Sequence, residues 1–220
     1  MPTAFTVMDC AILARTTGLA VQSLRELRDA LLKAEPESIY YHFWGGLLRP
    51  TFDDPEFIND FAVWAWRELR DRALAERLAM VDPAAHATIE ELREELLEVI
   101  ESHLDGLERP LWVDRDGQFD FLAARVTVIP TRDTIVTPED LPGGLRRFSR
   151  GSLFYHFIDA RRRHDESLDD LRAWLGGFDR TRYAPLSARL AGVDPFQGSL
   201  SRLRDQVLDA VNRGLAEVPE

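Results

Sequence analysis

The sequence predicts a predominantly helical α+β protein in which a strand-plus-helices unit occurs twice and its copies pack with pseudo-two-fold symmetry. The first observation is a repeated hexapeptide: SIYYHF at 38–43 returns as SLFYHF at 152–157. The second is that the similarity continues on both sides of it, and the third is that one β-rich segment opens each copy. We therefore divide the chain into repeat unit 1, residues 1–110, and repeat unit 2, residues 111–220, packed together as one compact protein.

The repeat keeps one register from its opening segment to the hexapeptide. Adding 114 carries Phe5 to Phe119 and Ser38 to Ser152 without a gap. Beyond the hexapeptide the offset changes because loop lengths change. The later matches are Asp60 and Trp64 with Asp170 and Trp174, LAERLAMVDP from Leu74 with LSARLAGVDP from Leu186, and the final apolar helical stripe from Ile89 with that from Leu200.

One strand is expected at the start of each copy. FTVMDCAIL and FDFLAARVTVI are rich in β-forming residues. Because a lone strand leaves its backbone polar groups unpaired, we expect the two opening strands to pair with each other.

Helix start signals follow each strand. An oxygen-bearing side chain precedes an acid by three residues at 23–26, 88–91 and 137–140, which is typical of an N-cap with an acidic first turn. A further helix is predicted to start at Asp54–Pro55 and to carry Phe57, Phe61 and Trp64 on one face. VDP, at Val81 and Val193, marks a break before each final helix, and residues 105–118 form the junction between the copies.

Composition excludes several classes of protein. The net charge is −11, and the first 110 residues hold 11 Lys and Arg against 21 Asp and Glu, so we expect no nucleic-acid partner. No apolar stretch approaches the length of a membrane span, and the N-terminus lacks the basic segment of a signal peptide. The single cysteine, Cys10, allows no intramolecular disulfide, which predicts a cytoplasmic location.

His42 and Asp60 are the candidates for catalysis. Their matches in the second copy are His156 and Asp170. A histidine oriented by an aspartate serves as a general acid or base. The alternative, which we favour, is a half-buried histidine that ties elements together, since a catalytic pair is rarely needed in both halves of a chain.

No other catalytic, cofactor or metal motif is present in the sequence. It contains no G-x-S-x-G, no Gly-rich phosphate loop and no H-E-x-x-H. His164, Asp165 and Glu166 are adjacent, but adjacency does not build a ligand face, so we read them as a solvated loop. The prediction is therefore a protein without a cofactor or a metal ion.

Residues found in only one copy are the candidates for binding. Trp64 and Trp174 match and are assigned to the core, whereas Trp44, Trp66 and Trp112 have no aromatic counterpart. On an ideal helix Trp66 lies about 140° from Phe61 and leaves the apolar face. Such an indole packs between two parts of the same chain, docks on another protein or stacks on a ligand. The basic candidates for holding an anion are Arg49, Arg161, Arg162 and Arg163.

The repeated pattern resembles a bacterial domain family, domain of unknown function 5752. The segments that carry the resemblance are SIYYHFWGGLLRPTFDDPEFINDFAVWAW and LFYHFIDARRR, and it covers nearly the whole chain. The resemblance implies no reaction and no catalytic residues. It does imply an association with genes for glycosyltransferases and other carbohydrate-active enzymes.

Three functions are compatible with these observations. The first, which we favour, is a non-catalytic partner protein that docks on another protein, such as a carbohydrate-active enzyme. The second is an enzyme that uses His42 and Asp60, with the segment at Trp44 as a wall of its site. The third is a binder of a small carbohydrate or phosphosugar, with Trp66 stacking and the arginines holding the anion. A homo-oligomer is also compatible with the sequence.

Overall fold

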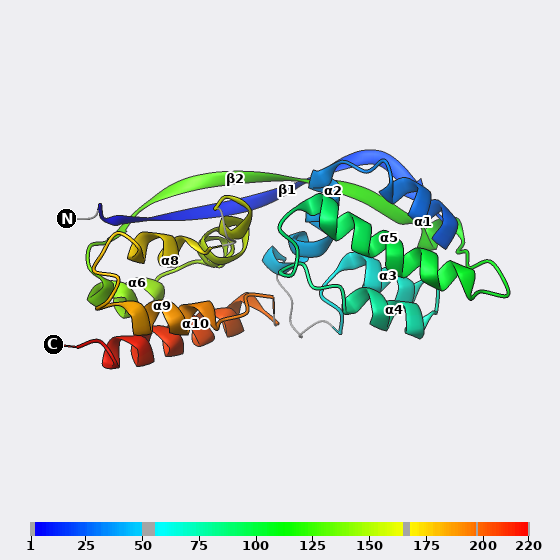
Figure 1. The fold of residues 1–220 in the computed structure, drawn as a ribbon. Helices are drawn as coiled ribbons and strands as arrows, with labels where there is room; N and C mark the ends of the chain where they lie inside the picture. Colours follow the sequence, from blue (N-terminus) through cyan, green and yellow to red (C-terminus); the bar gives the residue numbers. More distant parts are fainter. Residues whose placement is uncertain (1–2, 50–55, 165–167, 197, 220) are drawn as a thin grey trace. The chain divides into compact units, whose positions relative to one another are not determined.

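The computed structural model describes residues 3–49, 56–164, 168–196 and 198–219 (Figure 1). Two long strands, β1 (Phe5–Val21) and β2 (Phe119–Ile135), form a two-stranded sheet. The strands run antiparallel: Thr17 Oγ1 near the end of β1 donates to the carbonyl of Phe121, and Thr131 Oγ1 near the end of β2 donates to that of Val7. The expectation that the opening strands pair is confirmed.

The chain divides into two compact units. Residues 12–126 form one, here the continuous unit, and residues 1–11 with 127–220 form the other, here the split unit. These bounds differ from 1–110 and 111–220 because each strand contributes one segment to each unit. The helices of either unit therefore pack with a piece of both strands.

Side-chain caps start the helices of the continuous unit except α2, which starts at a proline, Pro36. Ser23 Oγ accepts from the N–H of Glu26, and Thr88 Oγ1 accepts from that of Glu91, as the sequence predicted. The unit also contains a 3₁₀ turn at Gly45–Leu48 and one at Arg115–Gly117 in the predicted junction. Its helices are α1 (Leu24–Leu31), α2 (Pro36–Trp44), α3 (Asp60–Arg67), α4 (Arg72–Ala79) and α5 (Ile89–Asp105).

The start of α3 differs from the sequence prediction. The predicted start, Asp54–Pro55, lies outside the described residues. Within the described part α3 begins at Asp60, because the side chain of Asn59 caps it by accepting from the N–H of Ala62 at 2.8 Å. Phe57 therefore precedes the helix, whereas Phe61 and Trp64 are buried from within it.

The split unit is more irregular. The predicted start at 137–140 is a capping box, but it opens a 3₁₀ turn, Pro138–Asp140, that runs into a short α6. Pro142 is compatible with the first turn of that helix, and Gly143 and Gly144 limit its length. The hexapeptide of this unit continues α7 as a π-helix, Phe154–Ile158, and then a 3₁₀ turn, Asp159–Arg162. The α-helices are α6 (Leu141–Leu145), α7 (Arg150–Leu153), α8 (Asp170–Leu175), α9 (Ala184–Ala191) and α10 (Leu200–Ala216).

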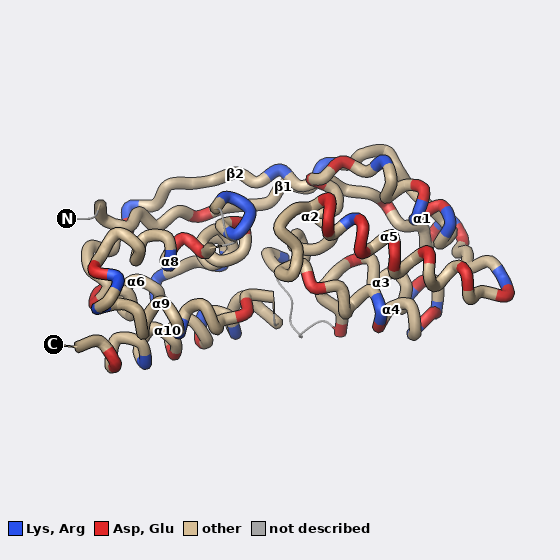
Figure 2. The backbone as a smooth tube through the Cα atoms, viewed as in Figure 1, with Lys and Arg blue, Asp and Glu red and all other residues tan. Residues whose placement is uncertain are grey.

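Elements at matched sequence positions have equal lengths in three cases. β1 and β2 have 17 residues each, α4 and α9 have 8 each, and α5 and α10 have 17 each. Acidic residues recur along α5 (Figure 2), and most of them are exposed. None of the described helices combines the length and the apolar character needed to span a membrane.

Candidate functional site

His42 is fixed inside the continuous unit by both of its ring nitrogens. It lies on α2 and is 3% exposed. Nδ1 lies 2.9 Å from Oδ2 of Asp60, the first residue of α3, and Nε2 accepts from the backbone N–H of Leu122 on β2 at 3.0 Å. The ring of Phe119 packs on it at a centroid distance of 4.6 Å. One side chain thus joins two helices and a strand.

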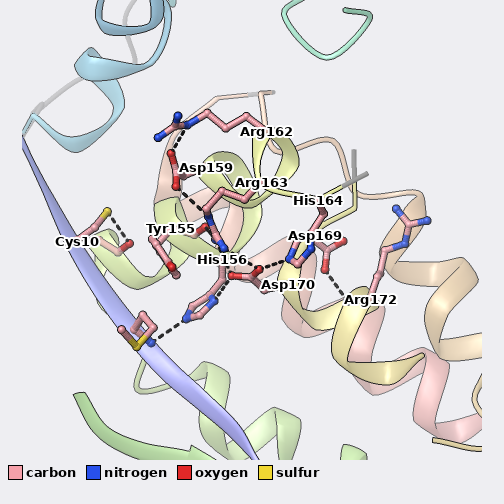
Figure 3. Close-up of polar contacts among 12 residues, drawn as sticks. Cys10, Tyr155, His156, Asp159, Arg162, Arg163, His164, Asp169, Asp170 and Arg172 are labelled. Atoms are coloured by element: carbon pink, nitrogen blue, oxygen red, sulfur yellow. Dashed lines mark hydrogen bonds and ion pairs between the residues drawn. The ribbon is translucent and has the colours of Figure 1, made fainter. Parts of the chain in front are cut away.

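His156 makes the matching contacts inside the split unit (Figure 3). It is 2% exposed. Nδ1 lies 2.6 Å from Oδ2 of Asp170, and Nε2 accepts from the backbone N–H of Met8 on β1 at 2.9 Å. The ring of Phe5 packs on it at 4.8 Å. The partners Met8 and Leu122, like Phe5 and Phe119, are 114 residues apart.

These hydrogen bonds determine the state of both imidazoles. A backbone N–H only donates, so Nε2 must be the unprotonated nitrogen and Nδ1 must carry the proton that it donates to the carboxylate. Both rings are therefore neutral and buried, with both nitrogens occupied. Neither ring offers a nitrogen to a substrate without breaking a hydrogen bond that holds the core, so the geometry favours a structural role.

Asp170 accepts hydrogen bonds from three side chains of the split unit. It accepts from His156, from Arg163 Nη2 at 2.8 Å and from His164 Nε2 at 2.6 Å. Burial by itself would raise the pKa of this carboxyl, but the hydrogen bonds from the three donors outweigh it and lower the pKa to about 2. Asp170 is consequently ionised at any physiological pH and does not act as an acid.

An arginine and a tyrosine complete the cluster in each unit. The Arg163 guanidinium lies 4.0 Å from the centre of the Tyr155 ring, and that of Arg49 lies 5.2 Å from the centre of the Tyr41 ring. Sequence reasoning did not connect Arg49 with Arg163. The signal was present, because these two arginines are 114 residues apart, as the two histidines are.

The cluster is more open in the continuous unit. Arg49 Nη2 is 3.8 Å from Asp60 Oδ2, and the Asp60 side chain is 28% exposed, against 11% for Asp170. A pocket of about 310 Å³ lies beside Asp60, with Arg67 and Glu68 among its lining residues. Of the two clusters, this one gives a solute more access to the carboxylate.

The three unmatched tryptophans occupy different environments. Trp44 is 7% exposed and packs on Tyr40 at a centroid distance of 4.7 Å, so the structure places it in the core and not on a binding surface. Trp66 is half-buried, and its ring makes an edge-to-face contact with that of Phe57 at a centroid distance of 6.3 Å. Trp112 is 68% exposed and forms an isolated antiparallel bridge with Ser23.

The arginines at 161–163 do not form an open anion site. Arg162 and Arg163 both pair with the buried carboxylate of Asp159, at 2.7 and 3.0 Å (Figure 3). Arg161 donates to the carbonyl of Val193 at 3.4 Å. All three side chains are engaged inside the split unit, which is why they do not converge on a solute.

The described residues contain no group of three His, Cys, Asp or Glu side chains placed to hold a metal ion. His164, assigned to a solvated loop, instead bonds to Asp170. Its neighbours Asp165 and Glu166 lie outside the described residues.

Comparisons with known proteins identify a family and a structural relative. A family described as "Family of unknown function (DUF5752)" matches residues 2–212. The structure is similar to that of OrfY from Thermoproteus tenax, with a TM-score of 0.83 and 25% sequence identity over 97% of this chain and 96% of that one. No curated protein matches the chain.

Proposed function

The chain belongs to this family of unknown function, and we propose that it is a non-catalytic partner protein that docks on another protein. The observation that carries the proposal is the state of the two histidines. The best catalytic candidates of the sequence are neutral, buried and fully hydrogen-bonded in both units. A histidine that makes the same structural hydrogen bonds in both units is a poor candidate for a catalytic residue.

We also propose that the architecture arose by duplication of one strand-plus-helices unit. Individual contacts repeat along with the sequence. The indole of Trp64 donates to the carbonyl of Gly117 at 2.8 Å, and that of Trp174 donates to the carbonyl of Thr3 at 2.9 Å. Gly117 and Thr3 are again 114 residues apart. An experimental structure in which His42 and His156 fail to coincide after superposition of the two units would reject the duplication.

The proposed docking surface is the apolar groove beside α4 in the continuous unit. The groove has a volume of about 650 Å³ and is lined by Phe57, Ala73, Ala79 and Met80 among others. Met80 is 80% exposed, which is unusual for a large apolar side chain. Trp66 extends the surface through its contact with Phe57. Aromatic and methionine side chains are enriched in protein interfaces.

Charge indicates which partner suits this groove. The first 110 residues, which supply the groove, hold an excess of ten acidic over basic side chains. A partner with an apolar centre and a basic rim complements both features, since opposite potentials favour association. The family resemblance makes a carbohydrate-active enzyme the first partner to test.

The test is capture of such an enzyme, and of unknown partners, from the native host by the tagged chain. We expect Trp66→Ala to weaken capture by about 2 kcal/mol, roughly thirtyfold, as for interface tryptophans, while leaving the melting temperature nearly unchanged. Trp112→Ala is the control, because it removes an exposed indole that is distant in sequence from α4. We expect it to leave capture unchanged.

Two results would contradict the proposal. If Trp66→Ala lowers stability by about 3 to 5 kcal/mol while the folded fraction binds its partner normally, Trp66 packs inside the protein and is not part of a docking surface. If His42→Ala melts like the parent but abolishes a host phenotype, the pair of His42 and Asp60 is catalytic, and the pocket beside Asp60 becomes the active site.

A further inference from the structure

The split unit contains a positively lined cavity between α8 and α9. Its volume is about 520 Å³, and its polar lining includes Arg172, Arg180 and Ser187, with Leu175 and Ala188 among its apolar walls. No carboxylate lines it among the described residues, although the chain carries a net charge of −11. The acidic excess of the chain lies in its first 110 residues, so the charge of this cavity has to be explained by its own lining.

Arg172 is the residue that makes the cavity unusual. Its side chain is half-buried, and its buried Nε has no hydrogen-bond partner among the described residues. Its backbone N–H donates a hydrogen bond to Oδ1 of the buried Asp169 at 2.9 Å. Among the described residues, no salt bridge joins the two side chains. The charges of Arg172 and Asp169 attract each other. The buried Nε nevertheless stays without a hydrogen bond, which costs free energy, so internal packing by itself does not account for this arginine.

Two further groups reinforce the positive potential. Arg180 is exposed at the cavity and forms no ion pair with another described residue. The first turn of α9 faces the cavity through Ala184 and Ser187, and no side chain caps this helix. The uncapped start of a helix carries a partial positive charge and favours an anion.

The sequence match places Arg172 in one copy only, whereas Arg180 corresponds to Arg70 at the same offset. At the offset of 110 that aligns Asp60 with Asp170, the position of Arg172 corresponds to Ala62. Ala62 is fully buried in the continuous unit. The cationic side chain therefore belongs to the split unit and not to the packing scheme that the two units share.

We propose that the cavity between α8 and α9 binds a small organic oxyanion, a phosphate or a carboxylate attached to a compact apolar group. Arg172 and Arg180 hold the oxyanion, since a guanidinium matches the oxygens of both groups. The Ser187 hydroxyl offers a further hydrogen bond. The start of α9 adds electrostatic support only, because Pro185 has no N–H and the N–H of Ser187 is bonded to the carbonyl of Tyr183. Leu175 and Ala188 contact the apolar group. The site is independent of the proposed docking surface, which lies in the other unit.

The test is calorimetric titration of the full chain with inorganic phosphate, phenyl phosphate and benzoate. We expect saturable binding of phenyl phosphate or benzoate that is tighter than that of inorganic phosphate, because the apolar walls bury the ring. The preferred ring compound distinguishes a phosphate ligand from a carboxylate ligand. Arg172→Gln/Arg180→Gln should weaken this binding at least tenfold. Arg25→Gln/Arg70→Gln, which removes two exposed arginines from the continuous unit, should change it less than twofold.

A second variant separates binding from folding. Arg172→Met keeps the aliphatic stem and removes the charge, so we expect an equal or higher melting temperature without ligand and weak binding of the anion. A lower melting temperature with unchanged binding would show that Arg172 serves the fold and would overturn the proposal. Absence of saturable binding up to about 10 mM of all three anions, or equal weakening by both double variants, would also overturn it.

Discussion

Replacing Asp170 by Asn should destabilise the protein by about 2 kcal/mol at neutral pH, and by progressively less in acid. The side chain is 11% exposed and is held by His156, Arg163 and His164. These hydrogen bonds lower its pKa from 3.8 to about 2 in spite of burial, and each pKa unit corresponds to about 1.4 kcal/mol. The difference between the two pKa values gives the predicted magnitude.

The sign of the pH dependence follows from the depressed pKa. A carboxyl whose pKa is lower in the folded state stabilises the fold fully above its unfolded-state pKa of 3.8. That stabilisation is lost as the pH falls through the folded-state value of about 2. The parent and Asp170→Asn should therefore differ most at neutral pH and converge between about pH 4 and pH 2.

Urea unfolding followed by circular dichroism, repeated at several pH values, measures this difference. Asp209→Asn is the control, because the Asp209 side chain is 58% exposed and its ion pair with Arg213 is worth little. We expect the control to change stability by less than about 0.5 kcal/mol. A parent-to-variant difference for Asp170 that stays constant from neutral pH to about pH 2 would refute the reasoning.

Three further predictions concern buried side chains. His42→Ala and His156→Ala should each lower stability by about 1 to 3 kcal/mol, because each leaves a backbone N–H and a carboxylate without a partner; equal unfolding curves for parent and variant would contradict this. Trp44→Ala should cost about 3 to 5 kcal/mol through the cavity it leaves, measured in the same assay. Burial, with Asp159 and Asp9 nearby, raises the pKa of the Cys10 thiol to about 12, so it should react with a thiol reagent at about pH 8 far more slowly in the native protein than in denaturant. Comparable rates in the two states would show that Cys10 is accessible.

The outline of the fold could be predicted because it depends on local chemistry. Ser23 and Thr88 cap helices where the sequence predicted, since a capping side chain lies within three residues of the N–H groups it satisfies. Strand pairing followed from the need to satisfy backbone groups in two isolated β-rich segments. The pairing of His42 with Asp60 was also anticipated, because both residues recur at matched positions.

Contacts between distant segments could not be predicted in this way. The partners of the histidine Nε2 atoms are backbone N–H groups, which every residue except proline possesses, so Leu122 and Met8 leave no signal in the sequence. Trp44 and Trp66 look alike in sequence, but one is in the core and the other is half-buried, because burial depends on which elements cover a helix.

The sequence by itself determined the repeated pattern, the helix caps, the two strands and the pairing of His42 with Asp60, because each depends on residues close in the chain or matched between the copies. Only the tertiary structure decided that each strand serves both compact units, that both histidines are neutral, and that Arg172 lines a cavity with its Nε unbonded. Those features depend on where segments more than a hundred residues apart meet, or on how neighbouring helices leave space between them. Packing sets these arrangements, and no short stretch of sequence encodes them.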